Sequence, residues 1–474
     1  MKKLITLSLV CVIFSFFLEA KEYFVRLSGN DNNFGSCKLP FRTIFKASEI
    51  AMPGDTITIW GGDYQLEKQF RPVRSGEPGK WIVYRGAPNE SVVFDGEQIK
   101  KVFRNGDSVQ FSSLTEGVFQ IEKVNYLRFE NIEVHNSNAA GFIVRGPDCK
   151  KIELMGCKSH HSHNSGIGLW YCDSVVVSGC EITGANDNSD LYFVPGQRKG
   201  GEAPHEALSL CGARYFEVAN NHIHDCFKEG IDCKEVSRHG VIHHNLVHDI
   251  PRQAYYVDAW FGLLEDIEFY SNTAYHTMWG IAISVEGKDS ELRNVRFHHN
   301  LIHHITGAGV LFGMWGNNLL RSDIHIYNNT FYSCGSPQVF SGGVGSIDVL
   351  SQNFREVFIY RNICDKGWDY EMGFTFPPSE VKWALKERNF IAEENLFECA
   401  KNRPSRVGQF GVHVYEYLPP NNQIGAPLYR NELKFDFVPE QLPEVKLSGR
   451  KWKYAPSPWF GAFEPIQINK LSKR

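Results

Sequence analysis

A six-residue pattern recurs through the middle of the chain and constrains its fold more than any other feature. It consists of an apolar residue, two polar residues, asparagine, any residue and a second apolar residue. The copies are VANNHI (218–223), IHHNLV (242–247), FYSNTA (269–274), FHHNLI (297–302), IYNNTF (326–331), IYRNIC (359–364) and AEENLF (392–397). Successive asparagines lie 24, 27, 28, 29, 33 and 33 residues apart. A recurring unit of this length is typical of proteins built from stacked repeats.

Each copy has the residue alternation of a β-strand. Apolar and polar residues alternate in stretches such as YFEVAN. The same phase continues upstream, without asparagine at the fourth position, in FENIEV (129–134), LMGCKS (154–159) and VSGCEI (177–182). A unit with two or three such strands cannot bury its apolar face alone, so successive units must stack and form parallel sheets. We therefore predict an all-β chain folded as a right-handed parallel β-helix.

Two columns of equivalent residues should run along this solenoid. The asparagine is expected in a buried turn, where a short amide side chain tolerates left-handed backbone and bonds to the next coil. Three residues after each asparagine, or its equivalent, stands a ring: His160, His224, His248, Tyr275, His303 and Tyr332. Histidine-rich stretches such as HIHD resemble zinc ligands, but they recur at a fixed coil phase, so we interpret them as structural and predict no metal site.

The cysteines follow the same repeat. Cys149 and Cys172 are 23 residues apart, as are Cys157 and Cys180, which is the spacing of neighbouring coils. Removal of Cys11 with the leader described below leaves an odd number, eleven, in a chain long enough to build its own core. We therefore expect small, buried thiols that stack from coil to coil and do not form disulfides.

The ends of the chain differ from its centre. Residues 1–20 have two lysines, an apolar run and a short polar step, which predicts a cleaved signal peptide and a secreted or periplasmic product. We assign residues 21–120 to an N-terminal cap and the first coils, 121–400 to the β-helix core, and 401–474 to a tail that packs on the helix or caps it. A net charge of −4 and the lack of a second long apolar run argue against nucleic acid and a membrane span. We expect a monomer.

An amphipathic helix is predicted over residues 40–51, close to the N-terminus. Phe41, Ile44, Phe45 and Ala47 share one side of it, which suits the covering of an open solenoid end. This strand, loop and helix resemble the N-terminal segment of exported β-helix carbohydrate-active proteins of the pectate-lyase-like superfamily, including chondroitinase and alginate-lyase relatives and family 9 pectate lyases. The resemblance implies the architecture and a carbohydrate ligand, without selecting a reaction.

Four strands that follow the coil turns carry the residues with chemical potential: HEALSL, KEGIDCKEV, AYYVDAWFG and GIAISVEGK. Side chains alternate along a strand, so if Ile231 and Cys233 point inward, Asp232 and Lys234 point outward. A spacing of 41 residues between Cys180 and the next ladder asparagine predicts an insertion just before these strands, and long insertions are commonly functional.

The following coil gives a second outward acid. Val257 and Ala259 are expected inside, which leaves Asp258 and Trp260 outside. We predict that Asp232 and Asp258 occupy equivalent positions in adjacent coils, separated by about 4.8 Å plus the effect of twist. Close approach of two carboxyl groups raises one pKa, which yields a proton donor and an ionised partner from the same side-chain type.

A wider patch surrounds this pair on consecutive coils. The predicted catalytic residues are Asp232, Asp258 and Glu206. The predicted substrate-binding residues are Lys234, Glu235, His205, Trp170, Trp260, Glu286 and Arg252. One parallel sheet of a solenoid presents a long, shallow face, which suits a chain polymer and favours a polysaccharide ligand.

Three functions remain compatible with these residues. A glycoside hydrolase would use the carboxylate pair without a cofactor, with Glu206 as a third candidate, and we favour this interpretation. A polysaccharide lyase would hold Ca²⁺ with the acids and use Lys234 or Arg252 as the base. For that second function, GIDCKE resembles the Asp and Lys strand of family 9 pectate lyases, although the clustered aspartates of that family are not evident. The third function is carbohydrate binding without turnover.

Overall fold

The computed structural model describes residues 19–99, 101–104, 107–110, 116–187, 205–313, 315–316, 319–336, 345–398, 406–407, 413–416 and 421–469. The predicted signal peptide lies outside these residues except for positions 19 and 20. Most of the predicted insertion, residues 188–204, also lies outside them.

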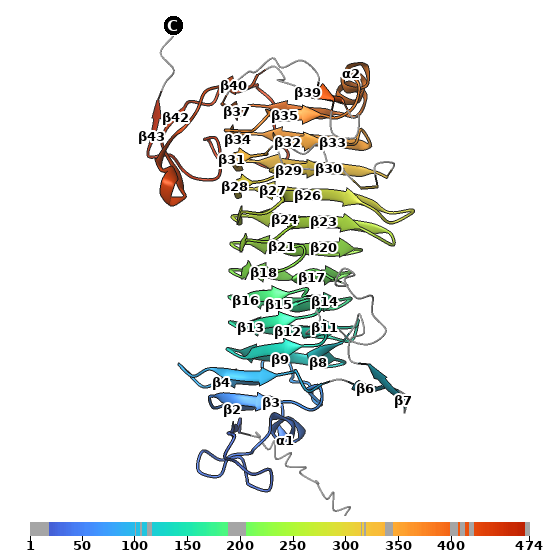
Figure 1. The fold of residues 1–474 in the computed structure, drawn as a ribbon, viewed down its shortest axis with the longest axis vertical. Coiled ribbons are helices and arrows are strands. Elements are labelled where there is room, and N and C mark those ends of the chain that lie inside the picture. The colour runs from blue at the N-terminus through green and yellow to red at the C-terminus, as the bar shows by residue number, and fades with distance from the viewer. Residues whose placement is uncertain are drawn as a thin grey trace, which may run out of the picture.

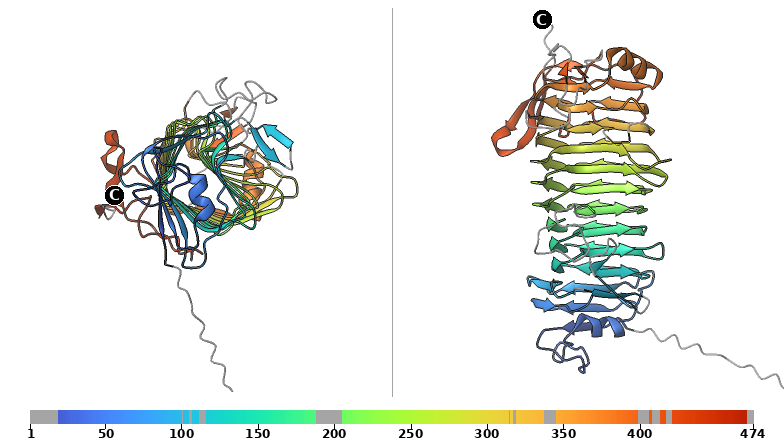
Figure 2. Two further views of the ribbon diagram at one scale, coloured as in Figure 1. Left: turned by 90° about the horizontal axis from the view of Figure 1, so that it is seen from below. Right: turned by 45° about the vertical axis from the view of Figure 1, so that its right-hand side comes forward.

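The chain winds into a tall stack of coils whose walls are three sheets (Figures 1 and 2). Sheet A contains β1 (Glu22–Val25), β2 (Thr56–Ile59), β4 (Ile82–Gly86), β9 (Asn125–Glu130), β12 (Lys150–Met155), β15 (Asp173–Ser178), β18 (Glu217–Ala219), β21 (Arg238–His243), β24 (Leu263–Tyr270), β27 (Glu291–His298), β30 (Arg321–Tyr327), β33 (Phe354–Tyr360) and β36 (Phe390–Glu393).

Sheet B contains β3 (Gly62–Gln65), β5 (Val92–Asp95), β10 (Glu133–Ser137), β13 (Lys158–Ser162), β16 (Glu181–Ala185), β19 (His222–His224), β22 (Leu246–His248), β25 (Thr273–Tyr275), β28 (Leu301–Ile305), β31 (Thr330–Cys334), β34 (Ile363–Asp365), β37 (Leu396–Phe397) and β40 (Gln423–Ile424).

Sheet C contains β8 (Gly117–Glu122), β11 (Ala140–Arg145), β14 (Ile167–Trp170), β17 (Leu208–Cys211), β20 (Ile231–Glu235), β23 (Gln253–Ala259), β26 (Trp279–Val285), β29 (Val310–Phe312), β32 (Gly345–Val349), β35 (Tyr370–Phe374), β39 (His413–Glu416) and β38 (Arg406–Val407). Each strand from β8 to β35 in this sheet pairs in parallel with the strand one coil away. The predicted fold class, an all-β right-handed parallel β-helix, is confirmed.

The interior of the stack is apolar, as the alternation predicts. Ile231, Cys233, Val257 and Ala259 are all buried in one continuous core that extends from β1 to β37. The predicted cysteine pairs also face this core, and the ten cysteines within the described ranges are free thiols. Burial of apolar surface contributes about 25 cal/mol per Å² to the free energy of folding. Apolar burial in this shared core is therefore the main interaction that stabilises the stack of coils.

The asparagine column is a continuous hydrogen-bonded ladder. The amide Nδ2 of Asn221 donates to Oδ1 of Asn245 at 2.9 Å and to the carbonyl of Val177 at 3.0 Å. The backbone N–H of Asn221 donates to the same Oδ1 of Asn245 at 3.0 Å. The pattern repeats coil by coil and extends one rung beyond the predicted copies, to Asn422.

One detail of the ladder differs from the prediction. The left-handed residue of each turn is not the ladder asparagine but the residue before it, for example His244 with φ of 54° and Ser271 with φ of 52°. The asparagine does not itself supply the unusual backbone; its side chain satisfies the polar groups that the turn leaves without strand partners.

The N-terminal helix is shorter than predicted. α1 spans Ile44–Ile50, because Thr43 is its N-cap and accepts a hydrogen bond from the N–H of Lys46 at 3.2 Å. Phe41 precedes the helix and bridges to Val25 as an isolated strand residue. Ile44, Ala47 and Phe41 are buried, so the segment covers the lower opening of the coil, as the end-on view in Figure 2 shows.

The C-terminal part packs against the outside of the stack. β41 (Leu428–Asn431), β42 (Asp436–Pro443) and β43 (Gln467–Asn469) form a small sheet on one flank, with the 3₁₀ turn η2 (Glu432–Lys434) between the first two (Figure 1). Phe460 is buried there against Ile363 and Leu396. The remaining elements are a hairpin of β6 (Lys101–Arg104) and β7 (Asp107–Gln110), and α2 (Pro378–Glu387) near β36.

The ladder generates a stability prediction. Asn272→Ala removes the donor to Asn300 and to the Ile242 carbonyl and the acceptor for Asn245, all of them buried. Each buried polar group left without a hydrogen bond lowers the free energy of unfolding by about 1–3 kcal/mol. The guanidinium concentration at the unfolding midpoint should therefore decrease. Asn32→Ala, which truncates an exposed side chain, is the control and should not shift the midpoint. An unchanged Asn272→Ala midpoint would show that the ladder is dispensable.

Candidate active site

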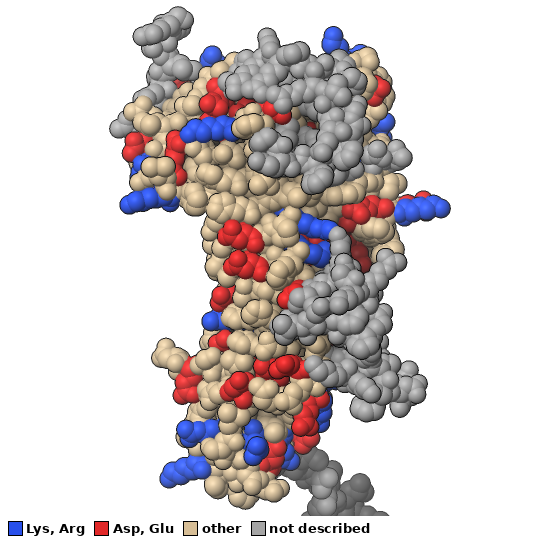
Figure 3. All heavy atoms as spheres, in the orientation of Figure 1, with Lys and Arg blue, Asp and Glu red and all other residues tan. Residues whose placement is uncertain are grey.

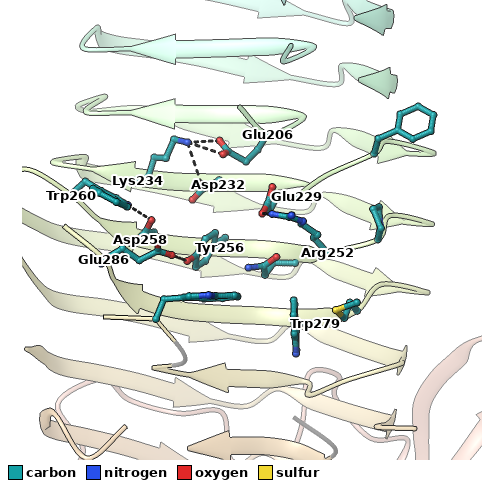
Figure 4. Close-up of a pocket in the computed structure, with 15 residues that line it drawn as sticks. Glu206, Glu229, Asp232, Lys234, Arg252, Tyr256, Asp258, Trp260, Trp279 and Glu286 are labelled. Atoms are coloured by element: carbon teal, nitrogen blue, oxygen red, sulfur yellow. Dashed lines mark hydrogen bonds and ion pairs between the residues drawn. The ribbon is translucent and has the colours of Figure 1, made fainter. Parts of the chain in front are cut away.

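A cleft of about 800 Å³ lies on the outer face of sheet C, over β20, β23 and β26 (Figure 4). Its lining residues are Glu206, Phe227, Glu229, Asp232, Lys234, Pro251, Arg252, Gln253, Tyr256, Asp258, Trp260, Met278, Trp279, Glu286 and Trp315. Seven of the ten residues predicted for the site are in this set. On the face drawn in Figure 3, basic and acidic side chains are intermixed near the lower end of the stack, whereas acidic groups predominate on the left at mid-height.

The predicted register of the two aspartates is wrong. Asp232 pairs with Tyr256, and Asp258 pairs with Lys234, so the two acids are offset by two residues along their strands. Both still lie on the same wall of the solenoid and line the same cleft. The offset inserts a lysine between them, because Lys234 directly precedes Asp258 in the column of outward residues.

Lys234 is the charged centre of the cleft. Its Nζ lies 2.7 Å from Oε2 of Glu206 and 3.7 Å from Oδ2 of Asp232, and its side chain is 14% exposed. The hydroxyl of Ser209 donates to the same Glu206 carboxylate at 2.8 Å. Burial alone would raise the pKa of Glu206, but Lys234 and Lys228 lower it to about 2. Glu206 is therefore an ionised carboxylate fixed by its contacts with Lys234 and Ser209, and Lys234 is a protonated ammonium.

Asp232 has the opposite electrostatic situation. Burial and the negative charge of Glu206 raise the pKa of Asp232 well above its usual range, even though Lys234 opposes this shift. Its Oδ1 is buried without a hydrogen-bond partner. A buried carboxylate with one oxygen left without a hydrogen bond is costly in its charged form, so this group favours the protonated acid.

Asp258 is held more tightly than Asp232. The indole N–H of Trp260 donates to Oδ2, and the backbone N–H of Glu286 donates to Oδ1 at 3.2 Å. Burial and Glu286 raise the pKa of Asp258, while the Trp260 bond lowers it. Burial also raises the pKa of Glu286, whose carboxylate accepts a hydrogen bond from the Tyr256 hydroxyl.

A second ion-paired carboxylate, Glu229, also lines the cleft. Glu229 accepts a hydrogen bond from Arg252 at 2.9 Å and lies 3.7 Å from Lys228. Our sequence interpretation missed Glu229, although a signal for it exists. Glu206 and Glu229 each stand two residues before a paired strand residue, Leu208 or Ile231, and so occupy the same coil phase.

Aromatic side chains form the far wall of the cleft. Trp279 packs edge-on against Trp315, with ring centroids 5.8 Å apart, and Tyr256 lies 6.0 Å from Trp315. The indole N–H of Trp279 and Oε1 of Gln253 are buried and unpaired. Unmet hydrogen-bonding capacity beside flat apolar rings suits a ligand with many hydroxyl groups and apolar ring faces.

Three predicted residues do not line the cleft. Trp170 is only 4% exposed and packs on His205, with ring centroids 4.7 Å apart. Glu235 has a left-handed φ of 61°, and its carboxylate accepts a hydrogen bond from Tyr171 outside the cleft. These three residues lie close to the site in the sequence but do not line its cavity.

Groups able to share a metal ion occur in the described part of the chain, but they stand on sheet B. One is His222, His224 and His248, and the other is Glu133, His135 and His160. Neither group includes a residue of the cleft. Of the helices that the structure describes, none has the length and apolar character required to cross a bilayer.

Comparison with known proteins defines the class of this chain as a right-handed parallel β-helix. Residues 23–209 match the family model described as "Pel9A-like, right handed beta helix region". The predicted resemblance is thereby confirmed for the architecture. The matched segment ends at β17, so it contains Trp170, His205 and Glu206 of the predicted site but none of the residues from β20 onward.

Individual relatives match over short stretches. Pectate lyase PEL9 of Emericella nidulans is 27% identical over 117 residues, which is 25% of this chain and 28% of that protein. Uncharacterized protein YwoF of Bacillus subtilis is 40% identical over 76 residues, 16% of each chain. The alignments therefore span less than a third of either curated relative.

Two solved structures share the fold. The endo-xylogalacturonan hydrolase from Aspergillus tubingensis superposes with a TM-score of 0.51 at 11% identity, over 85% of this chain and 100% of that one. The exopolygalacturonase from Thermotoga maritima gives 0.50 at 10% identity, over 68% and 83% of the two chains. At this identity the likeness concerns the architecture alone.

The Lys234–Glu206 pair generates a pH-dependent stability prediction. In the native protein the lowered pKa of Glu206 contributes stability above its ordinary pKa of 4.5, and this contribution is lost as pH falls toward about 2. Lys234→Met leaves a buried carboxylate without its main partner, which costs about 3–5 kcal/mol at neutral pH. The melting temperature should therefore drop most at pH 7 and least near pH 4, where Glu206 can protonate.

The double variant Lys234→Met/Glu206→Gln is the control for this prediction. It removes both charges, so most of the loss in melting temperature at pH 7 should be recovered. An equal loss in the single and double variants at every pH would mean that Lys234 acts through packing and not through its charge.

Proposed function

We propose that this protein is an exported glycoside hydrolase that cleaves a polysaccharide in the sheet C cleft. The observation that carries the proposal is the contrast between two neighbouring acids. Asp232 is buried with an unpaired Oδ1, whereas Asp258 accepts hydrogen bonds from Trp260 and from the N–H of Glu286. Glycoside hydrolysis requires one protonated and one ionised carboxyl group at the same bond.

The hydrogen bonds assign the roles within this pair. Burial raises the pKa of both groups, and the charge of Asp258 adds to the increase in the pKa of Asp232. Donors to a carboxylate stabilise its charged form, so the first proton to leave comes from Asp258 and Asp232 retains the second. Asp232 then protonates the leaving oxygen, and Asp258 acts on the anomeric carbon, either directly or through a water molecule.

Other lining residues would position the sugar. Glu206 and Lys234 form an ion pair next to Asp232, and their opposite charges shift the pKa of Asp232 in opposite directions. Trp279 and Trp315 offer apolar ring surfaces on the opposite side of the acids, and Arg252 borders the cleft near Glu229. A cleft of this kind on the side of a long solenoid suits an internal segment of a polymer.

Lyase chemistry is the second candidate, and the match to pectate lyase PEL9 favours it. Elimination needs an unprotonated base near the sugar C5 proton. Glu206 raises the pKa of Lys234 well above its ordinary value, although burial opposes this, so Lys234 is a poor base in this arrangement. Arg252 is engaged with Glu229. The electrostatics of the cleft therefore support hydrolysis over elimination.

Substitution of the two aspartates tests the hydrolase. Asp232→Asn and Asp258→Asn should each lower the release of reducing ends from plant, algal and host glycans by about 100-fold or more, because acid or base assistance is removed. Glu235→Gln is the matched control, since Glu235 lies outside the cleft. Full activity in either Asn variant would reject the pair.

The same assays separate the two reactions. Elimination would give unsaturated products that absorb in the ultraviolet, and Ca²⁺ dependence would make it sensitive to a chelator. Hydrolysis should give reducing ends without that absorbance and should continue in the chelator. Retention of oligosaccharides with no product of either kind would instead indicate a binding protein.

The pH profile supplies an independent check. Hydrolysis should fall at acid pH as Asp258 becomes protonated, and at alkaline pH as Asp232 loses its proton. Because burial raises both pKa values, both limbs of the kcat/KM profile should lie above 3.8, the ordinary pKa of aspartic acid. A rate that keeps increasing up to pH 10, as expected for a lysine base, would contradict the assignment.

A further inference from the structure

Three histidines come together on sheet B, on a different wall from the cleft. His222 and His224 are alternate residues of β19, so their side chains leave the same face of the sheet. His248 of β22 pairs with His224, and Glu181 of β16 pairs with His222. Three successive coils thus place one carboxylate and three imidazoles in a single patch.

The potential ligand atoms are close together. One ring nitrogen from each histidine can be chosen so that all three lie within 4.8 Å of one another. Nε2 of His222 is 2.8 Å from Nε2 of His248, and Nε2 of His224 is 3.5 Å from Oε1 of Glu181. Tetrahedral zinc bonds of about 2.0–2.1 Å place the ligand atoms about 3.3–3.4 Å apart, so small side-chain rotations that open the 2.8 Å contact between His222 and His248 would be needed to admit the ion.

Carboxylates orient two of the imidazoles. Nδ1 of His224 donates to Asp225 at 2.7 Å, and Nδ1 of His248 donates to Asp249 at 2.6 Å. A carboxylate acceptor fixes the proton on Nδ1 and directs the free lone pair of Nε2 toward the patch. This pairing of a carboxylate with a ligand histidine is the usual outer arrangement of zinc sites.

Ring stacking alone does not explain the cluster. The predicted column, in which His224 stacks on His248 at 5.2 Å and His248 on Tyr275 at 4.6 Å, accounts for those rings. His222 lies outside that column, in line with Glu181 and Leu246, yet its ring centroid is only 4.1 Å from that of His224. The column does not require a third imidazole at this position, and the contact of His222 with His248 brings nitrogens of all three rings together.

We propose that His222, His224 and His248 bind one Zn²⁺ ion or a similar borderline divalent ion, with Glu181 beside the site. This revises our sequence-based interpretation of these histidines as purely structural. Fixed coil phase and convergence are compatible here, because alternate residues of one strand and paired residues of its two neighbours share a single face. The ion would join β19 to β22 and stabilise the middle of the solenoid.

Titration of the whole 474-residue chain with ZnCl₂ tests the site. After treatment with a chelator and its removal, calorimetry should show one equivalent of Zn²⁺ bound and a rise in melting temperature. His222→Gln and His248→Gln should each weaken binding by about 100-fold or more, because each removes a ligand. Asp249→Asn keeps all three histidines and should weaken binding by about 10–100-fold.

Two matched variants serve as controls. His239→Gln removes a histidine of sheet A that also pairs with a carboxylate, Asp266 at 2.9 Å, but belongs to neither group able to share a metal ion, and it should leave binding unchanged. His160→Gln disrupts the other histidine group on sheet B and should also leave binding unchanged. Loss of the Zn²⁺ equivalent in His160→Gln, or its retention in a folded His222→Gln/His248→Gln double variant, would overturn the assignment.

Discussion

Pairing of each coil with the next through parallel backbone hydrogen bonds is the constraint on which the rest of this structure depends. A parallel strand cannot find its partner through a tight turn, so every coil must travel around the other two walls before it returns. The turns that allow this leave backbone groups without strand partners. The asparagine ladder satisfies those groups in each coil from Asn221 to Asn422, and it does so through the neighbouring coil, so that one coil completes the turn of the next.

This constraint also determines the electrostatics of the cleft. Residues from adjacent coils are brought within a strand spacing of each other, whatever their charge. The actual register puts Lys234 beside Asp258 and Tyr256 beside Asp232, so the acids are separated by a cation and a phenol and are not directly opposed. The result is a graded set: Glu206 is kept ionised by Lys234, Asp258 is stabilised by two N–H groups, and Asp232 has an oxygen with no partner. Identical or nearly identical side chains thereby acquire different protonation behaviour.

Much of the fold follows from periodicity in the sequence. The spacing of the asparagines, the inward alternation of Ile231 and Cys233 and the column of rings through His224 and His248 are all present as predicted, because each reflects a regular strand or turn. The register of the acids was predicted wrongly, because alternation determines which side chains point outward but not which residues of neighbouring strands pair. Counting from the ladder gives the right answer: Asp232 and Tyr256 each stand eleven residues after a ladder asparagine. Trp315, by contrast, reaches the cleft from a loop after β29, and no repeat phase indicates such a position.

The helix that covers the first coil affects whether two molecules can associate end to end. A solenoid ends in open strands whose N–H and C=O groups could pair with a second molecule, and two stacks joined end to end would bury fresh apolar surface. α1 lies over that end of the core and fills it with Ile44 and Ala47, so the first rung offers no template for growth. This N-capped helix of seven residues therefore prevents molecules from joining end to end at the N-terminal coil into a fibre.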